Sequence, residues 1–382
     1  MRSVGIIAEY NPFHNGHKYL LERAREKTDA DATVCFMSGN FVQRGDIAFC
    51  DKHTRAQAAV RCGADLVIQI PTAYTLAGSH IFAGAGVEMA SALGIPASLC
   101  FGSETQDLTP LFRLALTDRQ KLNCEFKKNI SQGKSYGDAV MLAYSACSDA
   151  DAALLKSPNN LLAFEYIKAV IEQKSDLKLV NIERRGACHD GKTADGGFAS
   201  ASYIRAHEGK DMSAFMPLKL KNAIDRQRFD SILLFSVYSK TATELSRFAD
   251  MSEGLNNRVF SAAQHAAGAK ELIFLVKSKR YTHARIRRAV INVLLQNPAG
   301  LCKTRVPYLN VLAFNDCGRT LLKKLEHTCS LPVITKPSRA GELENAGDHF
   351  ELECRASDIY DFCSKVRRGG GREYKISPLY VR

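Results

Sequence analysis

Two histidines three residues apart are the strongest chemical signal in the sequence. His14 and His17 lie in the segment EYNPFHNGHKYL, residues 9–20, with Gly16 between them. The apolar run before this segment predicts a first β-strand, and the residues from His17 onward predict a helix. Imidazoles at such a junction can donate N–H bonds to a phosphate and offset the charge that grows on its oxygens as pyrophosphate leaves. We therefore interpret H-x-G-H as a phosphate-binding loop, in which Gly16 lets the backbone come close.

A second motif complements the first. Ser200, Ser202 and Arg205 form an S-x-S-x-x-R pattern in FASASYIRAH, residues 198–207, at a predicted helix start. Hydroxyls and a planar guanidinium bind phosphate oxygens well. H-x-G-H alone is short enough to occur by chance, so the second motif adds weight to the first.

The elements that must position these residues alternate between strands and helices. Strands are expected at 4–8, 33–37, 66–70, 97–101 and 178–182, and helices at 17–27, 53–62, 79–93, 107–121 and 158–173. The last helix has a start signal, since Ser157 can cap it and Pro158 suits its first turn. The alternation predicts an α/β domain with a Rossmann-like parallel sheet. In such sheets ligands bind at the carboxyl ends of the strands, where free helix N–H groups attract anions.

The chain of 382 residues is long enough for two domains. The alternation fades after Arg205, so we expect a catalytic domain at 1–206 and a basic, largely helical domain at 207–382, with one strand-like run at 332–335. Of the net charge of +12, residues 206–382 supply most, with 29 Lys and Arg against 18 Asp and Glu. A basic domain favours a polyanionic partner, nucleic acid first, although a solvated basic surface is the alternative.

Two segments supply the candidate contacts to RNA. In KSKRYTHARIRRAV, residues 277–290, cations surround Tyr281, which suits phosphate contact and base stacking. Two further cations stand at a predicted helix start, where they are unfavourable unless an anion is near. The expected RNA-binding residues are Lys52, Arg55, Lys279, Arg280, Arg285, Arg287 and Arg288. A solvated helix face explains each of them as well.

Other classes of protein are disfavoured. No apolar run approaches the roughly 18 residues of a membrane span. The 12 cysteines are scattered without a C-x-x-C pair, so we expect reduced thiols, a cytoplasmic location and no structural metal. No P-loop pattern and no nucleophile elbow is present.

The two motifs together resemble those of the nucleotidyltransferase superfamily that includes class I aminoacyl-tRNA synthetases. Further segments narrow the resemblance: GIIAEYNPFHNGH, MSGNFVQRGD, FGSE, KSPNNLLAFEY and RVPYLNVLAFNDCGR are similar to the bacterial tRNA(Met) cytidine acetate ligase family over nearly the whole length. The resemblance implies ATP-dependent activation of acetate to acetyl-adenylate. It also implies acetylation of N4 of the wobble cytidine of elongator tRNA(Met).

By position, the resemblance assigns His14 and His17 to catalysis. It assigns to ATP binding Glu9, Tyr10, Asn11, Pro12, Phe13, His14, Asn15, Gly16, His17, Gly102, Asn159, Arg184, Ser200, Ser202 and Arg205. Gly102 would leave room for adenine or ribose. A shift of one residue would replace Asn159 by Asn160, or Arg184 by Arg185. Mg²⁺ is expected as the counter-ion of the nucleotide, without an identifiable protein ligand set.

Several points stay open at this level. The polar residues of the loop 38–46, namely Ser38, Gly39, Asn40, Gln43, Arg44 and Asp46, are expected to contact acetate or cytidine. His189 and Asp190 can form a general-base pair, or Asp190 can cap a helix, and Cys188 stands where the family would have an aromatic residue. A transferase that adenylylates a small phosphorylated metabolite and a catalytically silent RNA-binding protein are the alternatives. The oligomeric state cannot be inferred from the sequence.

Overall fold

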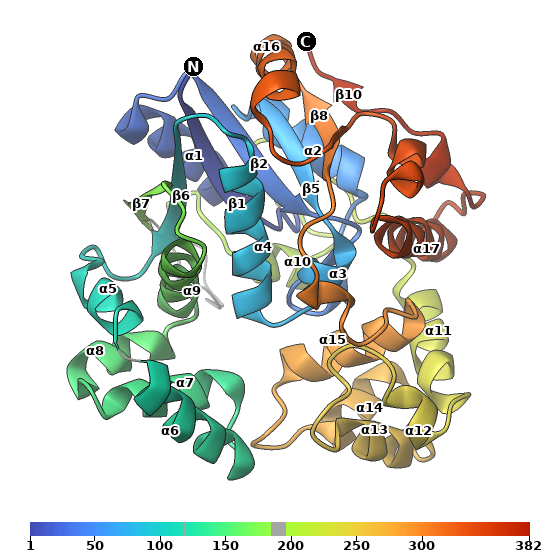
Figure 1. Ribbon diagram of the computed structural model, residues 1–382. Coiled ribbons are helices and arrows are strands. Elements are labelled where there is room, and N and C mark those ends of the chain that lie inside the picture. Colours follow the sequence, from blue (N-terminus) through green and yellow to red (C-terminus); the bar gives the residue numbers. More distant parts are fainter. Residues whose placement is uncertain (118, 185–195) are drawn as a thin grey trace.

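The computed structural model describes residues 1–117, 119–184 and 196–382. Its centre is an eight-stranded sheet in the order β10-β8-β5-β2-β1-β6-β7, with β9 paired to β8 (Figure 1). The strands are β1 (Ser3–Ala8), β2 (Ala32–Ser38), β5 (Leu66–Ile70), β6 (Ala97–Ser103), β7 (Lys178–Glu183), β8 (Leu309–Phe314), β9 (Val333–Ile334) and β10 (Leu379–Tyr380). All pairs are parallel except β5 with β8. The predicted α/β fold with a mainly parallel sheet is confirmed.

Helices cover both faces of the sheet because strand residues alternate between two apolar layers. Val4 and Ile6 of β1 pack with Leu21 of α1 (Asn15–Thr28) and with alanines of α2 (Lys52–Arg61). On the other face, Phe36 and Leu99 pack against α4 (Ser79–Ala92), α9 (Pro158–Glu172) and α16 (Asp316–Thr328). The predicted helix at 107–121 is two helices, α5 (Thr109–Ala115) and α6 (Arg119–Ser131).

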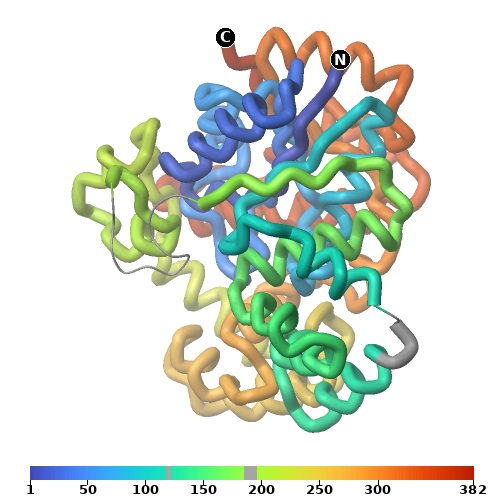
Figure 2. Tube along the Cα trace, turned by 90° about the vertical axis from the view of Figure 1, so that its left-hand side faces the viewer, coloured from blue at the N-terminus to red at the C-terminus, as the bar shows by residue number. Residues whose placement is uncertain are grey.

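Two groups of helices lie on the side of the sheet toward which the parallel strands run (Figure 1). The first group is α5, α6, α7 (Tyr136–Ser145) and α8 (Asp149–Ala153). The second group is α11 (Arg226–Tyr238), α12 (Ala242–Leu245), α13 (Leu255–Ala263), α14 (Ala269–Val276) and α15 (His283–Leu294). The two groups lie side by side (Figure 2). Where they meet, Arg280 donates hydrogen bonds to the carbonyls of Ile130 and Ser131 at 3.3 and 3.1 Å.

The remaining elements are short, apart from α17 (Gly347–Cys363), which packs against α3 (Thr72–Thr75) and α11. They comprise the hairpin β3 (Phe41–Val42) and β4 (Asp46–Ile47), the helix α10 (Ala201–Ala206), and the 3₁₀ turns η1 (Leu154–Lys156), η2 (Leu301–Lys303), η3 (Pro337–Glu342) and η4 (Arg372–Tyr374). No helix in the described part of the chain combines the length and the apolar character needed to cross a membrane.

The predicted boundary near residue 206 does not divide the molecule in space. Residues 225–294 form the basic helical group, but β8, β9, β10 and α16 return to the sheet. The β8 strand pairs with β5, whose edge would otherwise expose unpaired backbone groups. Its sequence LNVLAF is a short apolar run, which gives no periodic signal that separates a buried strand from a helix.

Candidate active site

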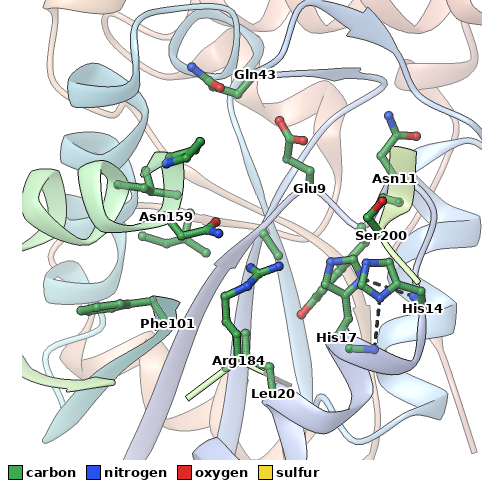
Figure 3. Close-up of a pocket in the computed structure, with 18 of the residues that line it drawn as sticks. Glu9, Asn11, His14, His17, Leu20, Gln43, Phe101, Asn159, Arg184 and Ser200 are labelled. Carbon is green, nitrogen blue, oxygen red and sulfur yellow. Dashed lines mark hydrogen bonds between the residues drawn. The ribbon is translucent and has the colours of Figure 1, made fainter. Parts of the chain in front are cut away.

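A cavity of about 410 Å³ opens at the carboxyl ends of β1, β6 and β7 (Figure 3). Of the fifteen residues assigned to ATP, twelve line it: Glu9, Tyr10, Asn11, His14, Gly16, His17, Gly102, Asn159, Arg184, Ser200, Ser202 and Arg205. Segments almost 200 residues apart in sequence therefore meet at one site. The lining also includes Gln43 and Arg44 of the polar loop.

The two imidazoles are held by the first turn of α1. His14 is the N-cap residue, and its Nδ1 accepts the backbone N–H of Gly16 at 3.1 Å. The Nδ1 of His17 accepts the backbone N–H of His14 at 3.2 Å. The two rings stack with centroids 3.7 Å apart. A Cβ on residue 16 would lie 3.0 Å from Cε1 of His14, so Gly16 makes room for the His14 ring.

These hydrogen bonds determine which nitrogen of each ring carries the proton. Because each Nδ1 accepts a backbone N–H, a neutral ring must carry its proton on Nε2. Burial, the charge of Arg184 and that of Arg205 lower the pKa of His14 to about 3. Burial, His14 and Arg184 also hold the pKa of His17 well below its ordinary value. Both imidazoles are therefore neutral at pH 7, and each offers one Nε2–H donor to an anionic ligand.

Low histidine pKa values also predict a pH-dependent stability. Burial lowers the pKa of His349 to about 4, so the folded chain resists a proton that the unfolded chain takes up near pH 6.5. Stability then falls as the pH drops from 6.5 to about 4, by up to about 1.4 kcal/mol per pH unit for each such buried histidine. His349→Phe keeps the stacking on Tyr74 and removes the titration. We expect guanidinium denaturation at pH 7 and pH 5 to show a flatter pH dependence for this variant, and an unchanged dependence would contradict the argument.

The backbone amides of the first turn of α1 are already used. Asn15 N donates to the carbonyl of Phe215 at 2.9 Å, and His17 N donates to the carbonyl of His14 at 2.9 Å. The expectation that free N–H groups of this helix bind the anion is therefore wrong. Side chains are therefore the groups of this loop that are left to bind a phosphate.

Three residues assigned to ATP do not line the cavity. The Asn15 side chain donates to the carbonyls of Gly197 and Ala214, which fastens residues 197–215 to the start of α1. Phe13 is buried beside His17, with ring centroids 5.5 Å apart. Pro12 follows a cis peptide bond and is buried as well. These residues shape the loop and do not face the cavity.

The second motif brings hydroxyls and a guanidinium to the same wall. Ser200 caps α10 by accepting the N–H of Tyr203, and its Oγ lies 3.0 Å from Oγ of Ser202. Arg205 donates to the carbonyl of Asn11 at 2.6 Å, which connects the two motifs. Figure 3 shows Ser200 beside the imidazoles and Arg184 extending into the cavity below Glu9.

On the opposite wall of the cavity, Asn159 and not its neighbour Asn160 lines the cavity. Glu104 of the FGSE motif accepts hydrogen bonds from the Asn159 side chain and from the backbone N–H of Asn160, so it caps α9. The predicted side-chain cap from Ser157 is absent. Asn160 is buried and accepts the N–H groups of Glu104 and Thr105. Because the Asn159 amide donates to Glu104, its Oδ1 remains as an acceptor for a ligand.

Gly102 lines the cavity, and the neighbouring Arg184 explains why this position has no side chain. A Cβ there would lie 3.0 Å from Cγ of Arg184. Its missing side chain therefore makes room for the Arg184 stem, whereas the sequence led us to expect room for adenine or ribose. Arg185, Cys188, His189 and Asp190 lie outside the described residues.

The polar loop 38–46 is mostly structural. Ser38 and Asn40 are buried, and Asn40 Oδ1 accepts the backbone N–H of Lys52 at 2.9 Å. Asp46 pairs with Arg226 at 2.7 Å, and Gly39 is packed against the Gln69 side chain. Gln43 and Arg44 alone among the six predicted residues of this loop line the cavity.

The structure contradicts direct RNA contact for two of the predicted cations. Lys52 is 1% exposed and donates to Gln69 and Glu373 at 2.8 and 2.6 Å. Arg55 is 0% exposed and donates to the backbone carbonyls of Glu9, Gly39 and Cys50. The anion that pairs with Lys52 at the start of α2 is therefore internal, and Arg55 is held by backbone carbonyls.

The remaining five predicted cations divide by exposure. Arg288 is buried and pairs with Asp250 at 2.9 Å, and Arg285 pairs with Glu253 at 2.9 Å. Arg280 joins the two helical groups, as described above. Lys279 and Arg287 are exposed. These two are the cations of the segment best placed to meet a polynucleotide.

The apolar lining of the cavity could not be predicted from the sequence. Phe82, Phe101, Tyr166, Leu20 and Ile182 face the cavity, yet their pattern is that of ordinary core positions. Glu104 belongs to the FGSE segment, but its residue type and spacing predict no role for it. Its role depends on the contact with Asn159, 55 residues away in sequence.

An open α/β sheet whose first strand leads into an H-x-G-H helix cap, facing an S-x-S-x-x-R helix, defines a nucleotidyltransferase of the HIGH class. The model of the HIGH nucleotidyl transferase family matches residues 1–373. A tRNA(Met) cytidine acetate ligase of Thermoanaerobacter sp. (strain X514) is 34% identical over 99% of both chains, and that of Pediococcus pentosaceus is 35% identical over 97% of this chain and 98% of its own. The chain belongs to the tRNA(Met) cytidine acetate ligase family.

Solved structures agree with this assignment. The apo crystal structure of Thermotoga maritima TmcAL superposes with a TM-score of 0.93 at 27% identity, and all of both chains is covered. The structure of the same protein bound with alpha-thio ATP superposes with a TM-score of 0.89 at 26% identity, again over all of both chains.

Proposed function

We propose that this chain activates acetate with ATP to acetyl-adenylate and then acetylates N4 of the wobble cytidine of elongator tRNA(Met). One observation carries the proposal. The cavity that gathers His14, His17, Ser200 and Arg205 occurs in a chain similar over its whole length to ligases of that name. A small-metabolite transferase would not need the basic helical group.

In the first step, an acetate oxygen attacks the α-phosphorus of ATP and pyrophosphate leaves. Charge grows on the phosphate oxygens as the bond breaks, so preorganised donors lower the barrier. The Nε2–H groups of His14 and His17 supply neutral donors, and Arg184 and Arg205 supply positive charge at the same wall. Because the backbone amides at the start of α1 are occupied, these side chains stabilise the growing charge on the phosphate oxygens.

The other end of the cavity suits a nucleoside. Phe101, Leu20 and Ile182 offer apolar surface for a base, and Asn159 Oδ1 offers an acceptor for an amine or a hydroxyl. Mg²⁺ would arrive on the phosphates, since no group of three or more His, Cys, Asp or Glu side chains among the described residues is arranged to hold a metal ion. A tRNA substrate fits the cytoplasm, as do the eleven cysteines in the described part of the chain, all of which are free thiols.

The exposed cations of the helical group should bind the tRNA backbone. Lys279→Glu combined with Arg287→Glu is expected to weaken tRNA binding by at least about tenfold and to reduce its salt slope by about two. ATP binding should not change, because neither residue lines the cavity. Filter binding at several salt concentrations measures the effect. Lys323→Glu, an exposed position on α16, is the control, and equal losses for both variants would contradict this location of the tRNA.

The proposed reaction is tested directly with ATP, labelled acetate and bulk tRNA. Digestion of the tRNA should yield labelled N4-acetylcytidine with the wild-type chain and none with His17→Ala. Label that stays in the nucleotide fraction would leave acetyl-adenylate as the end product. Label on a small metabolite would favour the alternative transferase.

A further inference from the structure

Glu9 stands at the carboxyl end of β1, in a backbone segment that is fastened on several sides. Arg55 donates to the Glu9 carbonyl, Arg205 donates to the Asn11 carbonyl at 2.6 Å, and the Asn11 side chain accepts the N–H of Phe49 at 2.7 Å. Tyr10 adopts a φ of 50°, so the chain turns sharply after Glu9. These hydrogen bonds hold the backbone of Glu9 and of its neighbours, and so fix the point from which the Glu9 side chain extends.

The carboxylate of Glu9 lacks a hydrogen-bond donor for one of its oxygens. Oε1 is buried without a partner in the described structure, and the residue lines the cavity. A buried carboxylate oxygen without a donor is costly, which indicates that a ligand supplies the donor. Acetate and the phosphates of ATP are acceptors at neutral pH. An amine or a hydroxyl of a substrate is required.

The direction of the carboxylate favours the RNA side of the cavity. In Figure 3 it points toward Gln43, on the side away from the two imidazoles. The carbonyl of Gln43 accepts a hydrogen bond from Arg288 of α15 at 3.3 Å, and Gly45 packs against Arg287. An RNA held over the exposed Arg287 would therefore reach the cavity at the Glu9 side.

On this basis, which rests on the proposed function, we propose that Glu9 is the catalytic base of acetyl transfer. The N4 nitrogen of cytidine attacks the acetyl carbonyl carbon of acetyl-adenylate, and the N–C bond forms. The bond between that carbon and the phosphate oxygen breaks, and AMP leaves with its electron pair. The Glu9 carboxylate takes one N4 proton and later releases it to water. General bases of this kind typically contribute about 10²–10⁴-fold to a rate.

Other groups at the cavity are less suited to this step. The Nδ1 atoms of His14 and His17 accept backbone N–H groups and their Nε2 atoms carry the protons, so neither ring has a free lone pair. Burial raises the pKa of Tyr166 far above neutral, so it holds its proton. Among the described lining residues, the second carboxylate is Glu183, which is exposed at the end of β7.

The test measures acetyl-adenylate formation and acetyl transfer separately in the variant Glu9→Gln. Glutamine has the same shape as glutamate and can still accept a hydrogen bond, but it cannot take up a proton. Acetate-dependent exchange of labelled pyrophosphate into ATP should stay within about threefold of the wild type. Acetyl transfer from synthetic acetyl-AMP to a tRNA(Met) transcript should fall at least about 100-fold. Glu9→Asp keeps a carboxylate and should retain more transfer than Glu9→Gln. Glu183→Gln tests the second carboxylate at the cavity and should retain far more transfer than Glu9→Gln. The matched control is Glu22→Gln, at an exposed residue of α1 that does not line the cavity, and it should change neither rate.

Three results would overturn the inference. Equal losses in exchange and transfer would make Glu9 a nucleotide-binding residue, and normal transfer by Glu9→Gln would exclude a proton acceptor there. A transfer defect in Glu183→Gln alone would move the role to Glu183. If the wild-type chain exchanges pyrophosphate but never labels RNA, the proposed function itself fails. Thermal melting of each variant verifies that it folds, and the unchanged exchange rate provides the same check internally.

Discussion

Replacing His17 with alanine is expected to lower the rate of acetyl-adenylate formation by about 10²–10³-fold, the usual cost of removing one preorganised donor to a developing charge. The His17 ring is neutral and its Nδ1 is occupied by the N–H of His14, so its Nε2–H is the atom that the variant removes from the cavity. Acetate-dependent pyrophosphate exchange measures this step without tRNA. ATP affinity should fall much less, because the donor acts most strongly in the transition state.

One further variant separates the loss of the Nε2–H donor from the loss of the hydrogen bond that caps the helix. His17→Asn keeps a short side-chain acceptor for the N–H of His14 but cannot place a donor where Nε2 lies, so its exchange rate should be as low as that of His17→Ala. The exposed His265 provides the control, and His265→Ala should exchange at the wild-type rate. Exchange by His17→Ala within about threefold of the wild type would show that the imidazole does not act on the phosphates.

The local part of this site was predictable from sequence because its signals are short-range. The apolar runs and the helix start that frame H-x-G-H are encoded within about 20 residues, and the first strand and helix lie where they were expected. The S-x-S-x-x-R motif also folds as a helix start, with Ser200 as its cap. Chemistry that depends on residue type and local spacing can be read in this way.

The rest could not be predicted because it depends on contacts distant in sequence. Lys52 at a helix start indicated an external anion, but its anion is Glu373, 321 residues later. The occupied amides of α1 depend on Phe215, and the role of Asn159 depends on Glu104. Sequence periodicity carries no information about such pairings. The prediction of phosphate or tRNA at this helix start was therefore wrong, because Lys52 pairs with an internal carboxylate and Arg55 donates to backbone carbonyls.

The same buried ion pair underlies the largest expected effect on stability. Lys52→Met should lower the free energy of unfolding by about 3–5 kcal/mol, because it leaves the buried Glu373 carboxylate without its cation. Glu353 lies in the same cluster, where it accepts hydrogen bonds from Gln69 and Thr72, and burial raises its pKa. Guanidinium denaturation measures the loss. The exposed pair Lys18–Glu22 gives the control, and Lys18→Met should cost less than about 0.5 kcal/mol.

The pH dependence of this loss distinguishes an unpaired charge from lost packing. Burial opposes the charged form of Glu373, but the charge and hydrogen bond of Lys52 hold its pKa below the ordinary value in the wild type. Without Lys52 the carboxyl must take a proton on folding, so the variant loses stability as the pH rises above the unfolded pKa of about 4.3. The difference between variant and wild type should therefore be larger at pH 8 than at pH 5. A difference independent of pH would show that Lys52 contributes only packing to the junction of α2, α17 and η4.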